Sequence, residues 1–422
     1  MEQKPSLTGP LIQTEIPGTQ SQKWIDRLAL RECPAITARR SRRAMTLGTA
    51  KDDPIVWKKA EGSVVQDVDG NCFIDLTAGF GVAAVGHRNP KVVQAAHNQL
   101  DILIHAMGDA FADPTRIELL DLLQKKTGFE RGILGCSGSD SVEAALKTAR
   151  IATGRTKILA FGRSYHGLAF GSLPATNYKT ESFKAPFQSW LGTHVEHCDF
   201  GGKLPDNLHE FAGVIVEPIQ GRGGIRVPPP HWLRDLIDLA NRDGAMVIFD
   251  EIYTGFGRTG QWFAFEHEDL EGRRPDLICL GKAMGGGFPI SVCMGTAQAM
   301  DSWGASKGEA IHTQTFLGNP LGCAMALASL RELEVIIPTV QEKGLWLTKK
   351  LQAMGYVVQG RGLLLGIQHS NSLALSRYLL HHGFIALPAG IHAEVLAITP
   401  PLIITKEELQ SFLTCLERFP DT

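Results

Sequence analysis

The segment Asp276-Leu-Ile-Cys-Leu-Gly-Lys-Ala-Met-Gly-Gly-Gly-Phe-Pro-Ile290 joins a short apolar run to a glycine-rich turn, and Lys282 stands at the junction. An apolar run of this length beside turn residues is typical of a buried strand. A buried ammonium group loses its proton readily, which makes the amine a nucleophile that can form a Schiff base with an aldehyde. The alternative for this segment alone is a lysine in solvent beside a flexible turn.

Similar apolar runs surround this segment and alternate with amphipathic helical patterns. Apolar residues recur at helical spacing from Val142 to Ala149, and again after the prolines at 228–230. The alternation predicts an α/β fold with a mostly parallel central sheet. The expected strands are residues 132–136, 157–161, 213–217, 245–250, 276–280 and 291–295.

The length of 422 residues exceeds the usual size of one core, so we expect more than one domain. From about residue 322 the pattern changes to a long helix followed by short strands, which predicts a smaller α+β domain. We expect residues 1–60 to form an N-terminal segment that joins this small domain. Residues 61–325 would form the large domain, and residues 326–422 the C-terminal part of the small domain.

Composition and charge favour an ordinary globular enzyme. Hydrophobic residues make up 44% of the chain, charged residues 20%, and the formal net charge is -2, so nothing points to a nucleic acid or a membrane as partner. The basic cluster at residues 38–43 is interpreted as a solvated face or the rim of a site. The eight cysteines include no Cys-x-x-Cys pair, and we expect no metal site and a cytoplasmic location.

Polar residues follow several of the expected strands, and ligands of α/β sheets gather at the carboxyl ends of strands. Cys136-Ser-Gly-Ser-Asp140 leads into a helix with capping-box spacing. The free backbone N–H groups of Gly138 and Ser139 at this helix start predict a phosphate cradle. The alternative is a turn that only caps the helix.

Two further strand ends carry candidate residues. Asp250 ends a very apolar strand, and a buried carboxylate needs a cationic partner, either a protonated ring nitrogen or an arginine. Tyr165-His-Gly167 follows the strand at 157–161, and Tyr165 could stack on a planar ring or merely pack in a loop. Together with Lys282 and the cradle, these residues describe a site for a phosphorylated aromatic aldehyde, which is pyridoxal phosphate.

Over roughly residues 35–415 the chain resembles the class III, ω-type aminotransferases of fold type I, the group that includes 4-aminobutyrate and ornithine aminotransferases. The matching motifs are Asp75-x-x-x-Gly79 with Gly86-His87, Ser137-Gly-Ser-Asp-Ser-Val-Glu-Ala-Ala145, Tyr165-His-Gly167, Glu217-Pro-Ile-Gln-Gly221, Asp250-Glu-Ile-Tyr-Thr-Gly-Phe-Gly-Arg-Thr-Gly260, Gly281-Lys-Ala-Met-Gly-Gly-Gly287, Thr315-Phe-Leu-Gly-Asn-Pro320 and Pro400-Pro-Leu402.

The resemblance implies a ping-pong transfer of an amino group from an amine or amino acid to a 2-oxo acid such as pyruvate or 2-oxoglutarate. Lys282 would form the Schiff base and move the proton, and Asp250 would pair with the pyridine nitrogen. Tyr165 and Ile252 would cover the two faces of the ring. The resemblance also implies a homodimer with its active site at the subunit interface. The cofactor site would be completed by residues of the same subunit, Ser137, Gly138, Ser139, His166, Glu217 and Tyr253. The partner subunit would add its Thr315.

The chain departs from the family where carboxylates are bound. Ala397 stands where members that act on amino acids usually carry arginine, and Leu168 where 4-aminobutyrate enzymes carry one. The usual glutamate after Gly221 is replaced by Arg222. We hypothesise that Arg222 takes over carboxylate binding; the alternative is that it points to solvent.

Two smaller departures concern the pocket. Tyr253 stands where the family has a glutamine that contacts the ring hydroxyl, and Phe80 falls where the family lines the substrate pocket. The alternative for both Tyr253 and Phe80 is a role in structural packing. An amino-acid racemase, epimerase or lyase on the same scaffold is the alternative function, and a non-catalytic cofactor-binding protein is a more distant one.

Overall fold

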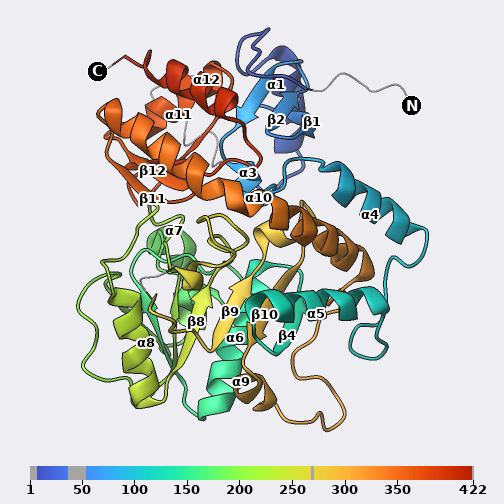
Figure 1. Ribbon diagram of the computed structural model, residues 1–422, viewed down its shortest axis with the longest axis vertical. Helices are drawn as coiled ribbons and strands as arrows, with labels where there is room; N and C mark the ends of the chain where they lie inside the picture. Colours follow the sequence, from blue (N-terminus) through green and yellow to red (C-terminus); the bar gives the residue numbers. More distant parts are fainter. Residues whose placement is uncertain (1–6, 37–53, 268–269, 421–422) are drawn as a thin grey trace.

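The structure is a computed structural model that describes residues 7–36, 54–267 and 270–420. The basic cluster at residues 38–43 lies outside the described residues. Figure 1 shows two groups of elements, with a large sheet in one group and both ends of the chain in the other. None of the helices within these ranges is long and apolar enough to cross a membrane.

The large sheet has seven strands in the order β4-β10-β9-β8-β7-β5-β6. Neighbours from β5 to β9 pair in parallel, whereas β10 is antiparallel to both β4 and β9. The predicted α/β fold with a mostly parallel sheet is therefore confirmed. The strands are β4 (Arg131–Gly135), β5 (Lys157–Phe161), β6 (Val195–Cys198), β7 (Phe211–Val216), β8 (Met246–Asp250), β9 (Leu277–Leu280) and β10 (Ser291–Gly295).

The sequence predicts six of these strands and misses β6. This strand lies at the edge of the sheet and pairs only with β5. Its residues, Val-Glu-His-Cys, are only partly buried and include the exposed Glu196, so they form no apolar run. An edge strand with solvent on one side does not need the continuous hydrophobicity that marks a central parallel strand.

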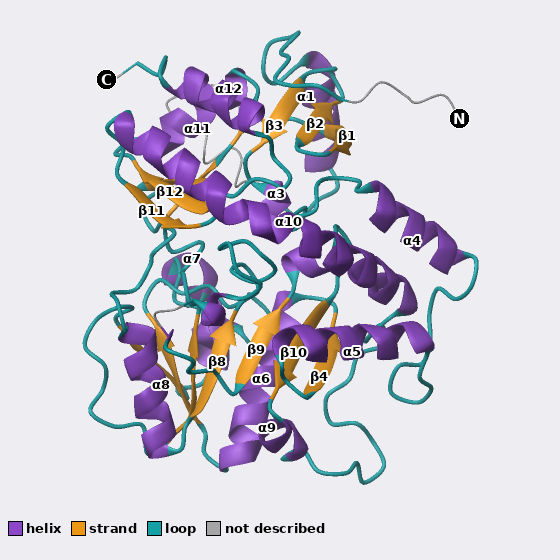
Figure 2. Cartoon of the chain, in the orientation of Figure 1, coloured by secondary structure: helices purple, strands orange, loops and turns teal. Residues whose placement is uncertain are grey.

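Helices cover both faces of the large sheet, as Figure 2 shows. The apolar side of α6 (Gly138–Thr153), including Val142 and Ala149, packs on one face with Ile158 and Ile248. The other face packs against a second cluster that includes residues of α5 (Pro114–Thr127) and α8 (Trp232–Asp243). Alternate residues of each strand thus enter different cores, which buries the sheet on both sides.

The second group of elements joins the two ends of the chain. One sheet has the order β1-β2-β3-β13, so strands from the N-terminal part pair with a strand from the C-terminal part. The other sheet is antiparallel, in the order β11-β12-β15-β14. The strands are β1 (Trp57–Glu61), β2 (Val64–Asp67), β3 (Cys72–Asp75), β11 (Val358–Arg361), β12 (Leu364–Gln368), β13 (Phe384–Ile385), β14 (Leu387–Ala389) and β15 (Val395–Ile398).

The long helix α10 (Pro320–Ala353) connects the two groups, as its course in Figure 1 shows. It starts at the N-cap Asn319, whose side chain accepts from the N–H of Gly322. The helix crosses residue 325, and the division at 60/61 and 325/326 stays a prediction. The remaining elements are α1 (Thr19–Ala29), α3 (Ala78–Gly81), α4 (Pro90–Leu100), α7 (Thr180–Phe183), α9 (Ala297–Asp301), α11 (Ser372–His381), α12 (Lys406–Leu416), and the 3-10 turns η1 (Leu173–Ala175), η2 (Ala185–Trp190), η3 (Ala264–Glu266) and η5 (Lys282–Gly285).

Candidate active site

Lys282 lies directly beyond the carboxyl end of β9, where it opens η5. Its φ of 35° is unusual for a residue with a side chain and marks a constrained position. Its Nζ lies 4.4 Å from the centre of the Tyr253 ring. Burial lowers the pKa of Lys282, the charges of Asp250 and Glu217 oppose this, and those of Arg222 and Arg258 lower it further. The amine is thus placed to lose its proton more easily than a lysine in water.

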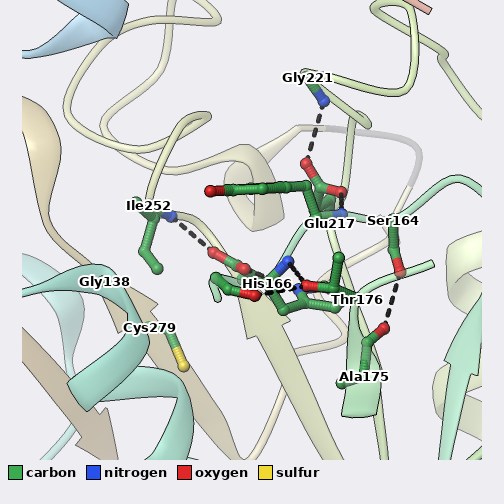
Figure 3. A network of polar contacts seen from close by, with 12 residues as sticks. Gly138, Ser164, His166, Ala175, Thr176, Glu217, Gly221, Ile252 and Cys279 are labelled. Carbon is green, nitrogen blue, oxygen red and sulfur yellow. Dashed lines mark hydrogen bonds and ion pairs between the residues drawn. The ribbon is translucent and has the colours of Figure 1, made fainter. Parts of the chain in front are cut away.

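Asp250 ends β8 and is almost completely buried. Its Oδ2 lies 2.7 Å from Nδ1 of His166, and its Oδ1 accepts from the backbone N–H of Ile252 at 3.1 Å. His166 is itself held by its backbone N–H, which donates to Thr176 Oγ1 at 2.9 Å (Figure 3). The sequence allows an arginine as the ion partner of Asp250. Among the described residues, the ion partner is His166. These bonds fix the orientation of the Asp250 carboxylate.

The start of α6 is the segment for which the sequence predicts a phosphate cradle. Ser137 caps the helix through a reciprocal capping box with Asp140, and the carbonyl of Ser137 accepts from Ser291 Oγ at 2.6 Å. Within the described ranges, the backbone N–H groups of Gly138 and Ser139 have no acceptor. A Cβ on Gly138 would lie 2.9 Å from Cδ1 of Ile252, so the side chain of Ile252 packs against the cradle. Two unpaired donors at a helix N-terminus suit a phosphate group.

Glu217 connects the loop that carries Tyr165 to the turn at Gly221. Its Oε1 accepts from the backbone N–H of Tyr165 at 2.9 Å. Its Oε2 accepts from the backbone N–H of Gly221 at 3.0 Å, a bond drawn in Figure 3. Burial raises the pKa of Glu217 to about 7. On the other side of Tyr165, a Cβ on Gly167 would lie 2.1 Å from Ser139 Oγ, so this loop also touches the cradle.

The side chain of Arg222 lies over aromatic rings and is half-buried. Its Cζ is 4.6 Å from the ring centre of Tyr165 and 5.3 Å from that of Tyr178. Of the two positions where the family carries arginine, Ala397 packs in a cluster with Tyr253, and Leu168 is 44% exposed.

Tyr253 is enclosed by two glycines. A Cβ added to Gly81 would lie 2.5 Å from Cε2 of Tyr253, and a Cβ added to Gly221 would lie 2.2 Å from Cδ1 of the same ring. Its hydroxyl makes a 3.0 Å hydrogen bond with Oγ1 of Thr399, and burial raises the pKa of this phenol. The Tyr253 hydroxyl therefore has a protein partner, whereas its ring lies beside Lys282.

Phe80 and Thr315 are both exposed. Phe80 precedes Gly81 in α3 and is 54% exposed. The buried carboxylate of Asp75 accepts from the backbone N–H groups of Thr77 and Gly79 and so holds this loop. Thr315 lies in the loop before α10, and no hydrogen bond joins it to the other candidate residues in the part of the chain that the structure describes.

Sequence reasoning missed three residues next to the site. Tyr178 carries no motif, and Thr399 could have been noticed because it directly precedes Pro400-Pro-Leu402. Arg258 is part of the motif at 250–260, but its burial was not foreseen. Its Nη1 donates to the carbonyls of Leu363 and Pro400 at 3.2 and 2.6 Å, and burial lowers its pKa to about 10. Arg258 thus joins the loop after β8 to two C-terminal segments, at Leu363 and Pro400.

The assembled residues fit pyridoxal phosphate. The cradle at Gly138 and Ser139 offers unpaired donors for the phosphate, Asp250 offers an oriented carboxylate for the ring nitrogen, and Lys282 offers an amine for the aldehyde. No set of three or more His, Cys, Asp or Glu side chains among the described residues could hold a metal ion.

Comparison with known proteins agrees with this fit. The sequence profile of the family "Aminotransferase class-III" matches residues 47–419. Acetylornithine aminotransferase of Methanosarcina mazei is 37% identical over 375 residues, which covers 86% of this chain and 91% of that protein. The [LysW]-aminoadipate semialdehyde/glutamate semialdehyde transaminase of Sulfolobus acidocaldarius is 36% identical over 365 residues, or 83% of this chain and 91% of that protein.

A solved structure supports the same assignment. The crystal structure of ornithine aminotransferase from Toxoplasma gondii superposes with a TM-score of 0.79 and 27% identity, covering 93% of this chain and 96% of that one. A second structure of that enzyme is described as having pyridoxal phosphate at partial occupancy in its active site. The chain therefore belongs to the class III aminotransferases, the pyridoxal-phosphate-dependent enzymes that transfer amino groups.

Proposed function

We propose that Lys282 is the residue that binds the cofactor covalently and moves the proton during amino-group transfer. The observation that carries this proposal is the meeting of the Lys282 amine, the Asp250 carboxylate and the α6 cradle at one edge of the sheet. When bound, pyridoxal phosphate supplies an electron sink for the pair left behind when a proton leaves the substrate carbon. The lowered pKa of Lys282 suits an amine that accepts that proton.

The neighbouring residues have supporting roles in this proposal. Asp250, oriented by His166, keeps the ring nitrogen protonated. Tyr165 and Ile252 would cover the two faces of the ring and exclude water. The free N–H groups of Gly138 and Ser139 hold the phosphate. The hydroxyls of Ser137 and Ser139, Glu217 and the Tyr253 ring complete the walls of the site.

We propose that the substrates are an amine or amino acid with an apolar part and a 2-oxo acid. Arg222 would receive a substrate carboxylate, because its half-buried guanidinium lies over the ring of Tyr165, next to the site. The exposed Phe80 lies next to Gly81, which contacts the Tyr253 ring, and would touch the apolar part. The relatives named for acetylornithine share this scaffold.

We also propose a cytoplasmic homodimer. Several large apolar side chains are exposed from the end of α4 to the first turn of α5, and the exposed Phe316 makes a ring contact with His105 of this segment at 5.3 Å. So many exposed apolar side chains in one segment are unusual on a monomer. Thr315, next to Phe316, would then reach the cofactor phosphate of the partner subunit. The exposed residues are Leu100, Ile102, Leu103, Ile104, Met107, Phe111 and Ile117.

A spectroscopic screen tests the function. The purified enzyme with bound cofactor is mixed with single amines or amino acids, and the cofactor absorbance is followed in the absence of any oxo acid. A transaminase converts the cofactor to its amine form and releases an oxo product, which pyruvate or 2-oxoglutarate then reverses. Return of the starting spectrum together with racemised substrate would contradict amino-group transfer and support the racemase alternative.

A further inference from the structure

We infer that the amino acceptor of this enzyme is a 2-oxo acid with a single carboxylate, bound through the guanidinium of Arg222, and that dicarboxylic 2-oxo acids are poor acceptors. This inference rests on the proposed aminotransferase function and narrows its substrate class. It follows from two observations. The guanidinium of Arg222 has no acceptor among the described residues, and nearby arginines bind protein groups.

The guanidinium of Arg222 is available for a ligand. It lies over the rings of Tyr165 and Tyr178, and the described residues give it no hydrogen-bond acceptor and no ion partner. Contact with a ring face satisfies the flat side of a guanidinium but leaves the N–H groups at its edge free. A carboxylate fits these N–H groups in a forked, two-bond geometry.

The backbone of Arg222 is held in place from two sides. The N–H of the preceding Gly221 donates to Glu217, which also holds Tyr165, so the cation and the ring beneath it share one anchor. The carbonyl of Arg222 accepts from the N–H of Gly390 at 3.0 Å. A cation fixed before the ligand arrives loses less conformational entropy on binding.

Three other arginines near this turn, within residues 54–267, make hydrogen bonds or ion pairs of their own. Arg163 pairs with Glu394 at 3.0 Å, and a Cβ on Gly223 would lie 2.8 Å from the Arg163 carbonyl, which shows that Arg163 is a neighbour of the turn. Arg226 donates to Gln220 and to the carbonyl of Phe200. Arg258 donates from Nη1 to two carbonyls, and its buried Nη2 has no hydrogen-bond partner among the described residues.

Among the described residues, Lys179 is a further cation near these rings, and it differs from Arg222 in its surroundings. Its Nζ lies 5.4 Å from the centre of the Tyr178 ring, but the side chain is exposed to solvent. An exposed ammonium is strongly hydrated and screened, so it adds little to the binding of a second carboxylate. Burying that second carboxylate near Ala397, which packs against a buried apolar cluster, would leave it without a partner, at a cost in affinity.

Binding of unreactive acids to the enzyme with bound cofactor tests the inference directly. Propanoate and glutarate match the acid groups of pyruvate and 2-oxoglutarate, and their dissociation constants can be measured by calorimetry. We expect propanoate to bind at least about as tightly as glutarate, and Arg222→Ala to weaken propanoate at least about tenfold. Arg222→Lys should recover part of this loss. Lys179→Ala is the matched control and should change either constant less than about twofold.

Two outcomes would overturn the inference. Glutarate binding that is much tighter than propanoate binding, and weakened by Lys179→Ala, would show a second carboxylate site. Propanoate binding unchanged in Arg222→Ala, with an unaltered cofactor spectrum and melting temperature, would remove Arg222 from the site.

Single-turnover rates then separate this inference from the proposed function. The amine form of the enzyme is mixed with pyruvate, 2-oxobutanoate or 2-oxoglutarate, and the two monocarboxylates should react at least about tenfold faster. Failure of every amine donor to convert the cofactor would contradict the proposed function. The calorimetry of propanoate and glutarate would then still test whether Arg222 binds a carboxylate. Equal or faster reaction with 2-oxoglutarate would contradict the inference alone.

Discussion

Nδ1 of His166 lies 2.7 Å from Oδ2 of Asp250, and both side chains are almost completely removed from solvent. The two residues are 84 positions apart; His166 lies in the loop after β5, and Asp250 is the last residue of β8. The contact joins the loop that carries Tyr165 to the strand end that carries the carboxylate. One hydrogen bond thus aligns a candidate stacking residue with a candidate partner of the ring nitrogen.

Replacing the Asp250 carboxylate should damage catalysis more than folding. Asp250→Asn keeps the shape but removes the negative charge that would hold a proton on the ring nitrogen. We expect kcat to fall by about 10²–10³-fold, as for other preorganised electrostatic partners. Steady-state kinetics and cofactor affinity measure this effect, and Asp250→Glu is the control that keeps the charge. A variant with nearly normal kcat would show that Asp250 has a structural role only.

The buried Glu217 should make stability depend on pH. Its pKa is raised from 4.5 to about 7, so between these values the folded protein keeps a proton that the unfolded chain has released. Stability therefore falls as pH rises through this window, and above it the full cost reaches about 3 kcal/mol. Glu217→Gln removes the titration. Urea unfolding of the cofactor-free proteins should show the variant gaining stability relative to wild type from about pH 5 to about pH 7.

The comparison is internally controlled because Glu251, also buried with a pKa raised to about 7, is present in both proteins. Its contribution cancels in the difference between wild type and variant. A stability difference that stays constant across the window would mean that the Glu217 carboxyl ionises normally in the folded protein.

A subunit-mixing experiment tests the shared active site. Thr315→Asp would place a negative charge against the phosphate of the partner subunit, and Lys282→Ala removes the amine, so each variant should be inactive alone. In a mixed dimer, one site combines a normal Lys282 with a normal Thr315. Refolding equal amounts together should restore about a quarter of the wild-type activity, because half the dimers are mixed and each has one intact site. Activity that stays at the level of the parents would argue against a shared site.

The sequence predicts the central strands because their burial is a local property. Each parallel strand has helices on both faces, so runs such as residues 245–249 are apolar throughout. Strand β6 escapes this rule because it lies at the edge. The sequence also does not predict that β10 is antiparallel to β9, because the glycine-rich turn after Lys282 is compatible with either strand direction.

The contacts within the site were harder to foresee because they join distant residues. Lys282 and Asp250 could be singled out because each is a charged residue at the end of an apolar strand. The placement of Arg222 on Tyr165 depends on the bonds of Glu217 to two separate segments. The bond of Tyr253 to Thr399 spans 146 positions and two groups of elements. No local pattern encodes such pairs, and they follow only from the packed fold.

The most direct test of the central claim is chemical mapping of the residue that binds the cofactor. The enzyme with bound pyridoxal phosphate is reduced with borohydride, digested and analysed by mass spectrometry. We predict one label per chain, on the peptide that contains Lys282, and no label on the active-site peptides of Lys282→Ala. Lys184 is the natural competitor, because burial lowers its pKa to about 8. A label on Lys184 or another lysine in the wild-type enzyme would contradict the assignment of Lys282.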